Sequence, residues 1–324
     1  MERFDEGLYL TTSQVAELAD VHPSTVKRWC NDGDLPYDTT DGGHRRIYLA
    51  DVLGLTGRKG IDTILDHFAP YQAHVWTAIQ EAIEEDDYER FRSLALGWLD
   101  RGKIERLGWL FREFGRHPRI PFESFGDKAI RSFMVEIGEL WRSGALRSGE
   151  EHMATEVLVE TLLRLRDQGG RSDVPGGANP PVAIVGAMEG DRHHLASLCL
   201  RIMLERRGWH VYYLGADVPV EDFAALQKQH RAGLVCVSFA PPNTGADMQR
   251  CVRILSEFYN GAHPWTLVLG GGVHPLPKID VTPFEDFRIF TSLTDFGAAL
   301  DEGLARSGAG AEGAPADSTF SAEA

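Results

Sequence analysis

A carboxylate and a histidine two residues apart are the side chains in this sequence best suited to chemistry. Asp191 and His193 follow an apolar run, residues 182–188, that is typical of a buried strand. In such a pair the acid can accept a hydrogen bond from one ring nitrogen, which leaves the other nitrogen to coordinate a metal. One histidine cannot hold a bare ion, but it can supply an axial ligand to a metal already held by a macrocycle. A hydrogen-bonded histidine that binds no metal is the alternative.

Small and polar residues stand at the ends of other strand-like runs in the same part of the chain. Five such runs, separated by helical patterns, cover residues 182–188, 210–215, 234–240, 266–272 and 288–292. This alternation predicts an α/β, flavodoxin-like parallel five-stranded sheet, which binds ligands at the carboxyl ends of its strands. Ser238, Gly270 and Gly271 end the third and fourth runs, so we expect them near Asp191 and His193.

The loop after the first run argues against nucleotide cofactors. It reads GAMEGDRHH where a dinucleotide site would have G-x-G-x-x-G, and the chain has no P-loop. The clustered glycines would instead leave a slot for something bulky beside the sheet.

Residues 60–168 carry an apolar pattern of helical period. Helical stretches near 62–84, 87–101, 104–115, 122–143 and 149–168 predict a bundle of four main helices. Trp141 ends one stretch and the pair Glu151-His152 begins the next, so they should meet at one end of the bundle. The alternative is purely structural: a capping box between Ser148 and Glu151, a solvated His152 and a core Trp141.

The first 58 residues carry the inventory of a DNA-reading helix. Thr11 can cap a short helix, and Pro23 suits the first turn of a second one, in which Val26 and Trp29 face inward. The outer face of the second helix then presents hydroxyls and cations able to reach base edges and phosphates, namely Ser24, Thr25, Lys27 and Arg28.

A Gly-Gly turn between two short strands comes next and predicts a wing. Its tip carries His44, Arg45 and Arg46, which suit contact with the phosphate backbone. The stretches TTSQVAELADVHPSTVKRW, GDLP and GGHRRI resemble the α winged helix-turn-helix of the MerR/excisionase superfamily. A small helical interaction domain is the alternative. Because acids outnumber bases in residues 1–58, binding to a double-stranded DNA operator would be salt-sensitive and would need a dimer, tetramer or other oligomer with several heads.

The rest of the chain carries the motifs of a second resemblance. The stretch GDRHHLAS resembles the D-x-H-x-x-G motif of cobalamin-binding domains. The later S-x-L and G-G positions of those domains fall on Ser238, Gly270 and Gly271. Trp141, nine residues and then Glu151-His152 match the W-x9-E-H motif of adenosylcobalamin-binding photoreceptor regulators of the CarH/LitR type, which also share this domain order.

The resemblance implies a role for each matched residue. His193 would be the lower axial ligand to cobalt, and Asp191 its hydrogen-bond acceptor. The slot for the nucleotide tail would be lined by Ser238, Gly270 and Gly271. The upper face and its adenosyl group would be contacted by Trp141, Glu151 and His152. The implied function is a regulator of transcription rather than an enzyme, in which light breaks the cobalt–carbon bond, the bundle moves and the heads release DNA.

Two residues depart from the family's pattern. Ala196 stands where the motif has its glycine, and the extra methyl could crowd the corrin. Arg142 comes after the tryptophan where light sensors of this type can carry a histidine that takes the cobalt, and a guanidinium cannot donate a lone pair. Two other functions therefore stay open: a cobalamin-independent transcription factor whose C-terminal fold binds proteins, and a corrinoid methyl carrier.

Length and composition suit two or three globular domains, because the chain has 324 residues, 43% hydrophobic and 25% charged. The expected parts are a DNA-binding head at 1–58, a helical bundle at 60–168, a linker at 169–181, a cobalamin-binding domain at 182–306 and a disordered tail at 307–324.

Charge, cysteines and hydropathy limit the partners. The net charge of −15 argues against a protein that coats nucleic acid, though a small reading head remains compatible with it. Four cysteines without C-x-x-C spacing are expected to be buried reduced thiols, with neither disulfides nor a zinc site. No apolar run reaches the ~18 residues that cross a bilayer, so we expect a cytoplasmic protein with no membrane partner.

Overall fold

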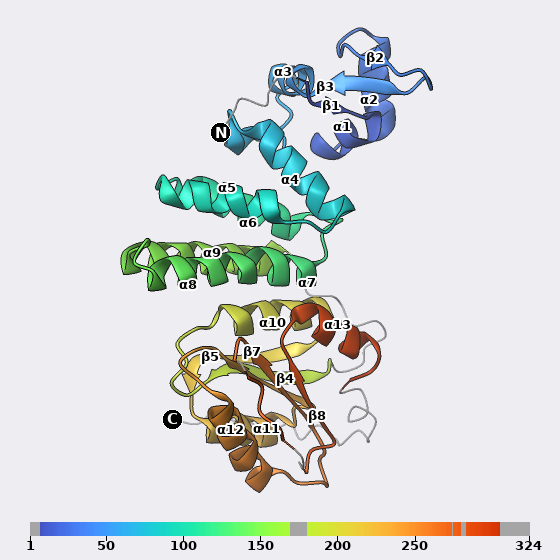
Figure 1. Ribbon diagram of the computed structural model, residues 1–324. Helices are drawn as coiled ribbons and strands as arrows, with labels where there is room; N and C mark the ends of the chain where they lie inside the picture. The colour runs from blue at the N-terminus through green and yellow to red at the C-terminus, as the bar shows by residue number, and fades with distance from the viewer. Residues whose placement is uncertain (1–6, 169–179, 274, 280–282, 305–324) are drawn as a thin grey trace, which may run out of the picture. The chain divides into compact units, whose positions relative to one another are not determined.

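The computed structural model describes residues 7–168, 180–273, 275–279 and 283–304 (Figure 1). These residues form two compact units, Met1–Leu165 and Arg166–Ala324, and each unit is described by itself. The predicted tail, and all but the last two residues of the predicted linker, lie outside the described residues.

The first unit begins with three helices and a small sheet. The helices are α1 (Thr12–Leu18), α2 (Pro23–Asn31) and α3 (Leu49–Lys59), and the strands are β1 (Tyr9–Leu10), β2 (Asp38–Thr39) and β3 (Arg45–Tyr48). The strands pair antiparallel in the order β1-β3-β2. As predicted, Thr11 caps α1 in a capping box with Gln14, and Pro23 opens α2. Val26 and Trp29 are buried, which leaves the opposite side of α2 for other contacts.

Helices make up the rest of the first unit. They are α4 (Gln72–Glu84), α5 (Glu89–Asp100), α6 (Ile104–Arg116), α7 (Phe122–Ser124), a π-helical stretch (Phe125–Arg131), α8 (Ser132–Arg142) and α9 (Ser148–Gln168). Their core is aromatic: Phe91 stacks edge-on against Phe111, and Phe111 against Phe133, and all three are buried.

The predicted helix at 62–84 is wrong in its first ten residues. The structure has a 3-10 turn at Asp66–Phe68, and α4 starts only at Gln72. Pro70 explains the difference, because proline has no N–H to donate and its ring clashes with the preceding helical turn.

The second unit is a parallel sheet with helices on both faces. Its strands are β4 (Val182–Met188), β5 (His210–Val218), β6 (Leu234–Phe239), β7 (Thr266–Gly271) and β8 (Asp286–Phe290). They lie in the order β5-β4-β6-β7-β8, which is the flavodoxin-like order and confirms the predicted fold. Only β8 is displaced from its predicted position, by two residues.

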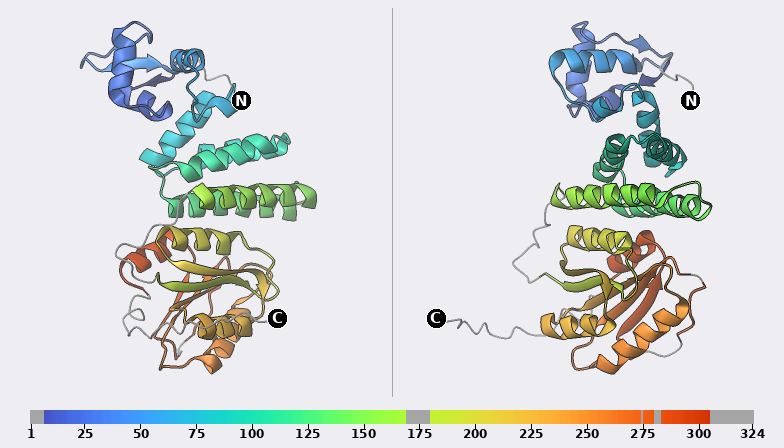
Figure 2. Two further views of the ribbon diagram at one scale, coloured as in Figure 1. Left: turned by 180° about the vertical axis from the view of Figure 1, so that it is seen from behind. Right: turned by 90° about the vertical axis from the view of Figure 1, so that its left-hand side faces the viewer.

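Among the described residues, three helices connect the strands, and a fourth follows β8. They are α10 (Leu195–Arg206), α11 (Val220–His230), α12 (Gly245–Phe258) and α13 (Leu293–Asp301). Helices α10 and α13 cover one face of the sheet, and α11 and α12 cover the other (Figure 2). The apolar core continues from strand to helix: a Cβ added at Gly186 in β4 would lie 3.1 Å from the buried ring of Phe223 in α11. Glycine at this position therefore lets the helix approach the sheet closely.

All four cysteines are buried thiols that form no disulfide, as predicted. Burial raises the pKa of the Cys251 thiol to about 12, so this thiol stays protonated near neutral pH. Among the described residues, no helix has the length and apolar character needed to span a membrane.

Two phenylalanines of the second unit provide a matched test of this packing. We expect Phe223→Ala to lower the unfolding free energy by about 3–5 kcal/mol, because Phe223 is fully buried and its removal leaves a cavity. Phe258→Ala should change it by no more than about 0.5 kcal/mol, because Phe258 is 53% exposed. Hydrogen exchange of the β4 and β6 amides in increasing urea measures both values. Equal losses would contradict this packing of α11 against the sheet.

Candidate cofactor site and DNA interface

The Asp191 carboxylate is fully buried at the carboxyl edge of the sheet and is satisfied by three donors. Its Oδ1 accepts the backbone N–H of His193 at 2.8 Å and lies 3.0 Å from the Nδ1 of the same residue. Its Oδ2 accepts the backbone N–H of Ala240 at 2.7 Å. One buried charge thus ties the loop after β4 to the loop after β6 and also holds the imidazole.

A second aspartate holds the turn that carries this pair, and sequence reasoning missed it. Asp217, near the end of β5, accepts the backbone N–H of Gly190 at 2.7 Å and donates its own N–H to the carbonyl of Asp191 at 2.9 Å. Its φ of 56° lies in the left-handed region, which aspartate tolerates better than most residues. Its place at the carboxyl edge of the second predicted strand was the available signal.

The contact with Asp191 decides the tautomer of His193. An ionised carboxylate can only accept, so Nδ1 carries the ring proton and Nε2 carries the lone pair. The side chain is 62% exposed. Nε2 is therefore the atom that would coordinate a metal. His194 next to it is the N-cap residue of α10.

Glycines and buried polar atoms without a hydrogen-bond partner lie at and after the ends of the neighbouring strands. The hydroxyl of Ser238 is buried and has no hydrogen-bond partner in the described structure, and the same holds for Oδ1 of Asn243 in the following loop. In register with Ser238 is Gly270, where a Cβ would lie 3.0 Å from the carbonyl of Phe290. A Cβ on Gly271 would fall 1.8 Å from a carbonyl of β6. The edge thus requires these glycines and retains buried polar atoms that a ligand could satisfy.

The predicted bundle residues lie at the turn between α8 and α9. The indole of Trp141 is 52% exposed and donates from Nε1 to the hydroxyl of Ser148 at 3.0 Å. His152 Nδ1 lies 3.2 Å from Glu151, whose other oxygen accepts from Thr155. The structural alternative of a core Trp141 is therefore wrong. The Trp141 indole and the His152 imidazole are both exposed at this end of the two helices.

The head exposes much of its predicted reading surface. Ser24, Lys27 and Arg28 of α2 are exposed, and Thr25 is half-buried. His44 is exposed in the turn between β2 and β3.

The two arginines of the wing are held by neighbours. Arg45 turns back from the wing: its guanidinium donates to the carbonyl of Lys27 at 3.1 Å and to Asn31 at 2.6 Å, and it stacks on Tyr37. Arg46 lies over the ring of Tyr9. Arg45 thereby fastens the wing to α2, and direct phosphate contact by each residue stays a prediction.

One substitution tests the buried carboxylate without any ligand. We expect Asp191→Asn to loosen the site, because the amide nitrogen of asparagine cannot accept the N–H bonds that the carboxylate accepts. The cost of an unsatisfied buried group, about 1–3 kcal/mol, predicts roughly 5- to 150-fold faster exchange of the Ala240 amide. Nitrogen NMR should also show His193 losing its single tautomer. The exposed Asp222→Asn is the control, and unchanged exchange in Asp191→Asn would refute the assignment.

Comparison with known proteins shows what this architecture is similar to. A B12 binding domain matches residues 181–280, and a helix-turn-helix domain matches residues 9–55. The HTH-type transcriptional repressor CarA of Myxococcus xanthus is 30% identical over 261 residues, which cover 79% of this chain and 84% of CarA. Dimethylamine corrinoid protein 3 of Methanosarcina acetivorans is 26% identical over 155 residues, 47% of this chain and 70% of that protein.

The solved monomethylamine corrinoid protein of Methanosarcina barkeri shares the fold, with a TM-score of 0.50 and 15% identity over 64% of this chain and 95% of that one. Similarity to a repressor supports a non-enzymatic role, and the two matched domains support binding of cobalamin and of DNA. The chain belongs to the CarA-like family of cobalamin-binding transcriptional regulators, in which a helix-turn-helix head is joined to a B12-binding domain.

Proposed function

We propose that this regulator uses adenosylcobalamin as its cofactor and responds to light by releasing DNA. The observation that carries the proposal is the exposed His193 ring, whose Nδ1 is held by the buried Asp191 carboxylate. An axial ligand needs such a fixed tautomer, because the hydrogen bond from one ring nitrogen leaves the lone pair of the other for the metal.

The residues of the sheet edge fit a corrinoid. His193 Nε2 would hold the cobalt, and Asp191 would raise the basicity of the ring. The buried, unsatisfied hydroxyl of Ser238 would supply a donor for the nucleotide tail, and Gly270 and Gly271 let the neighbouring strand backbones approach closely at the same edge. Ala196 is exposed in the first turn of α10, so its methyl strains no protein neighbour and acts only on what lies against that surface.

The bundle carries side chains whose chemistry would suit the adenosyl group. Trp141 offers an exposed indole for stacking, and Glu151 and His152 offer polar atoms for the hydroxyls of the adenosyl group. When bound, adenosylcobalamin supplies a cobalt–carbon bond that light breaks. Without the adenosyl group these three side chains would lose their ligand, and the bundle would be free to move.

Arg142 limits how the cofactor can be held after illumination. It is exposed at the end of α8, next to Trp141, and its guanidinium stays protonated. It therefore cannot replace the lost upper ligand as a histidine could. Among the residues assigned to the cobalt, only His193 would then remain as a ligand after illumination.

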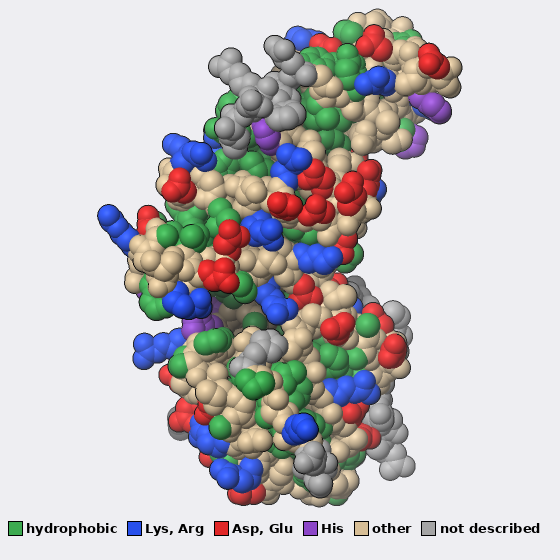
Figure 3. Space-filling model, viewed as in Figure 1, with side chains coloured by type: hydrophobic (Ala, Val, Ile, Leu, Met, Phe, Trp, Pro, Cys, Tyr) green, Lys and Arg blue, Asp and Glu red, His purple; other side chains and the backbone are tan. Residues whose placement is uncertain are grey.

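DNA binding requires several heads. Charged side chains of both signs are interspersed over the viewed face (Figure 3), so the attraction to phosphates is local to the head. Two or four copies of the chain, held together while the cofactor is intact, raise the affinity by multivalency. Loss of the assembly on illumination therefore releases the operator.

A corrinoid methyl carrier is the second candidate, favoured by the similarity to methylamine corrinoid proteins. Two features count against it. The chain carries a DNA-reading head, and the exposed Trp141 surface would cover the face that a methyl acceptor must reach.

Absorbance and size measurements test the cofactor and the switch together. The full chain, purified in the dark with adenosylcobalamin, should keep the corrinoid absorbance through gel filtration and should change in size after illumination. His193→Ala should lower the affinity for adenosylcobalamin at least about tenfold. The exposed His263→Ala is the control. A colourless product would instead support a cobalamin-independent transcription factor, and equal affinities would remove His193 as ligand.

Salt dependence tests the DNA interface. We expect Lys27→Ala to weaken operator binding and to reduce the slope of log affinity against log salt by about one, because one phosphate contact is lost. Lys228→Ala, which removes an exposed lysine of α11, should leave the slope unchanged. If both variants bind like the parent chain, α2 does not lie against the phosphate backbone at Lys27.

A further inference from the structure

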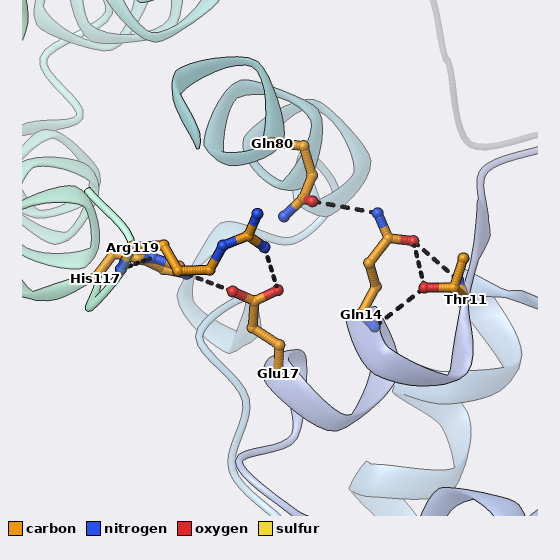
Figure 4. A network of polar contacts seen from close by, with 6 residues as sticks. All are labelled: Thr11, Gln14, Glu17, Gln80, His117 and Arg119. Carbon is orange, nitrogen blue, oxygen red and sulfur yellow. Dashed lines mark hydrogen bonds and ion pairs between the residues drawn. The ribbon is translucent and has the colours of Figure 1, made fainter. Parts of the chain in front are cut away.

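Polar side chains join the DNA-reading head to the bundle within the first unit. Glu17 of α1 places one carboxylate oxygen 3.4 Å from His117 Nε2 and the other 3.4 Å from the guanidinium of Arg119 (Figure 4). Gln14, three residues earlier, donates from Nε2 to Oε1 of Gln80 in α4 at 3.2 Å. We call these five residues the clamp. None of them belongs to the cofactor site or to the predicted reading surface.

The contact between Glu17 and His117 does not need a protonated histidine. The backbone N–H of Arg119 points at Nδ1 of His117 at 3.3 Å, so Nδ1 accepts and the ring proton sits on Nε2, facing Glu17. The side chain of His117 is only 6% exposed, and burial lowers its pKa, with Glu17 acting in the opposite direction. The clamp is therefore formed by a neutral donor and by the exposed cation of Arg119.

The clamp fixes an orientation because it reaches two separate elements of the bundle. Gln14 and Glu17 are three residues apart on α1 and so lie on one face of this short helix. The first contacts α4, and the second contacts the segment that follows α6. A single contact would leave the head free to rotate about it, whereas two contacts to different elements oppose that rotation.

Docking through α1 leaves the reading helix open. Val15 and Leu18 of α1 and Val26 of α2 are buried together in the core of the head, so the two helices move as one body. The exposed side of α2, with Lys27 and Arg28, takes no part in the clamp. Any change in how α1 sits on the bundle must therefore turn the recognition helix by the same amount.

We propose that Glu17 and Gln14 are positioning residues for DNA binding, which clamp the head to the bundle so that the bundle sets the direction in which α2 meets the operator. This inference rests on the proposed switch, in which the bundle changes state. Because the clamp holds each head to its bundle, a change in the bundle would change the distance between the heads of an assembly. DNA then selects assemblies whose heads match the distance between half-sites.

The clamp can be broken without damaging the head. Gln14 also holds the cap of α1, where its Oε1 accepts the backbone N–H of Thr11 at 2.9 Å, so replacing it would weaken the helix itself. The amide contact is better removed from the bundle side, with Gln80→Ala. Glu17→Ala removes the other contact, and the carboxylate makes no other polar contact among those of the described residues.

The test measures the distance between head and bundle in the full chain. Spin labels at Asp41→Cys in the wing turn and Asp100→Cys at the end of α5 occupy exposed positions, and the four native thiols are buried. We expect a narrow distance distribution in the labelled parent and at least a twofold broader one in the variant carrying both Glu17→Ala and Gln80→Ala. Glu84→Ala, which removes an exposed carboxylate from α4, should leave the width unchanged.

Either of two results would contradict the proposed clamp. One is an equal width of the distance distribution in the parent and the double variant, and the other is a parent distribution as broad as a freely rotating head would give. Circular dichroism checks that helix content is retained. Should the double variant lose helix, Arg119→Ala removes one exposed partner of Glu17 and must broaden the distribution to a smaller extent.

Operator spacing connects the clamp to DNA binding. Inserting five base pairs between half-sites turns one of them by about half a helical turn, and we expect the parent to lose at least about tenfold in affinity. The double variant should lose less than about threefold, with its affinity for a single half-site unchanged. Equal losses would show that the clamp does not direct the heads. If the parent binds no operator, the proposed function fails, while the distance measurement still decides the clamp.

Discussion

The second unit depends on one buried negative charge. An ionised carboxylate inside a protein is tolerated only when donors surround it, because the desolvation penalty is otherwise too large. Asp191 meets this condition with two backbone N–H groups and one imidazole. The same three bonds fix the loop after β4, the loop after β6 and the tautomer of His193. The stability of this sheet edge and the orientation of the His193 ring therefore both depend on the bonds of Asp191. A change that breaks these bonds alters both.

Two glycines and a buried hydroxyl lie at the same edge of the sheet as Asp191. Glycines at 270 and 271 allow close contacts between the backbones of neighbouring strands, which a side chain would block. The buried hydroxyl of Ser238 stays unsatisfied at the same edge. Such an atom costs free energy in the unliganded protein, and a ligand that supplies a partner recovers it. A buried hydroxyl without a partner is therefore a feature that binding of a polar ligand would stabilise.

Sequence patterns predicted the secondary-structure elements and the titratable residues of the site. They did not predict the backbone groups that bond to those residues. Apolar runs located four of the five strands closely, and the rule for parallel sheets placed Ser238 and Gly270 beside Asp191. The N–H of Ala240 carries no signal in residue type, so its bond to Asp191 required the folded chain. Arg45 was expected at the wing tip because it follows the Gly-Gly turn closely, yet its guanidinium bonds to Lys27 and Asn31 of α2. The interface between head and bundle depends on residues 102 positions apart, which no local pattern can pair.

The charge balance explains why head orientation matters in this chain. A net charge of −15 gives little general attraction to DNA, and the head itself carries more acids than bases. Its few exposed cations can add up only when several heads meet their half-sites at once. That condition concerns geometry rather than contact strength, since a freely rotating head spends most of its time misaligned. A polar clamp made of weak individual bonds is sufficient for this purpose, because it has to hold a direction and not to supply affinity.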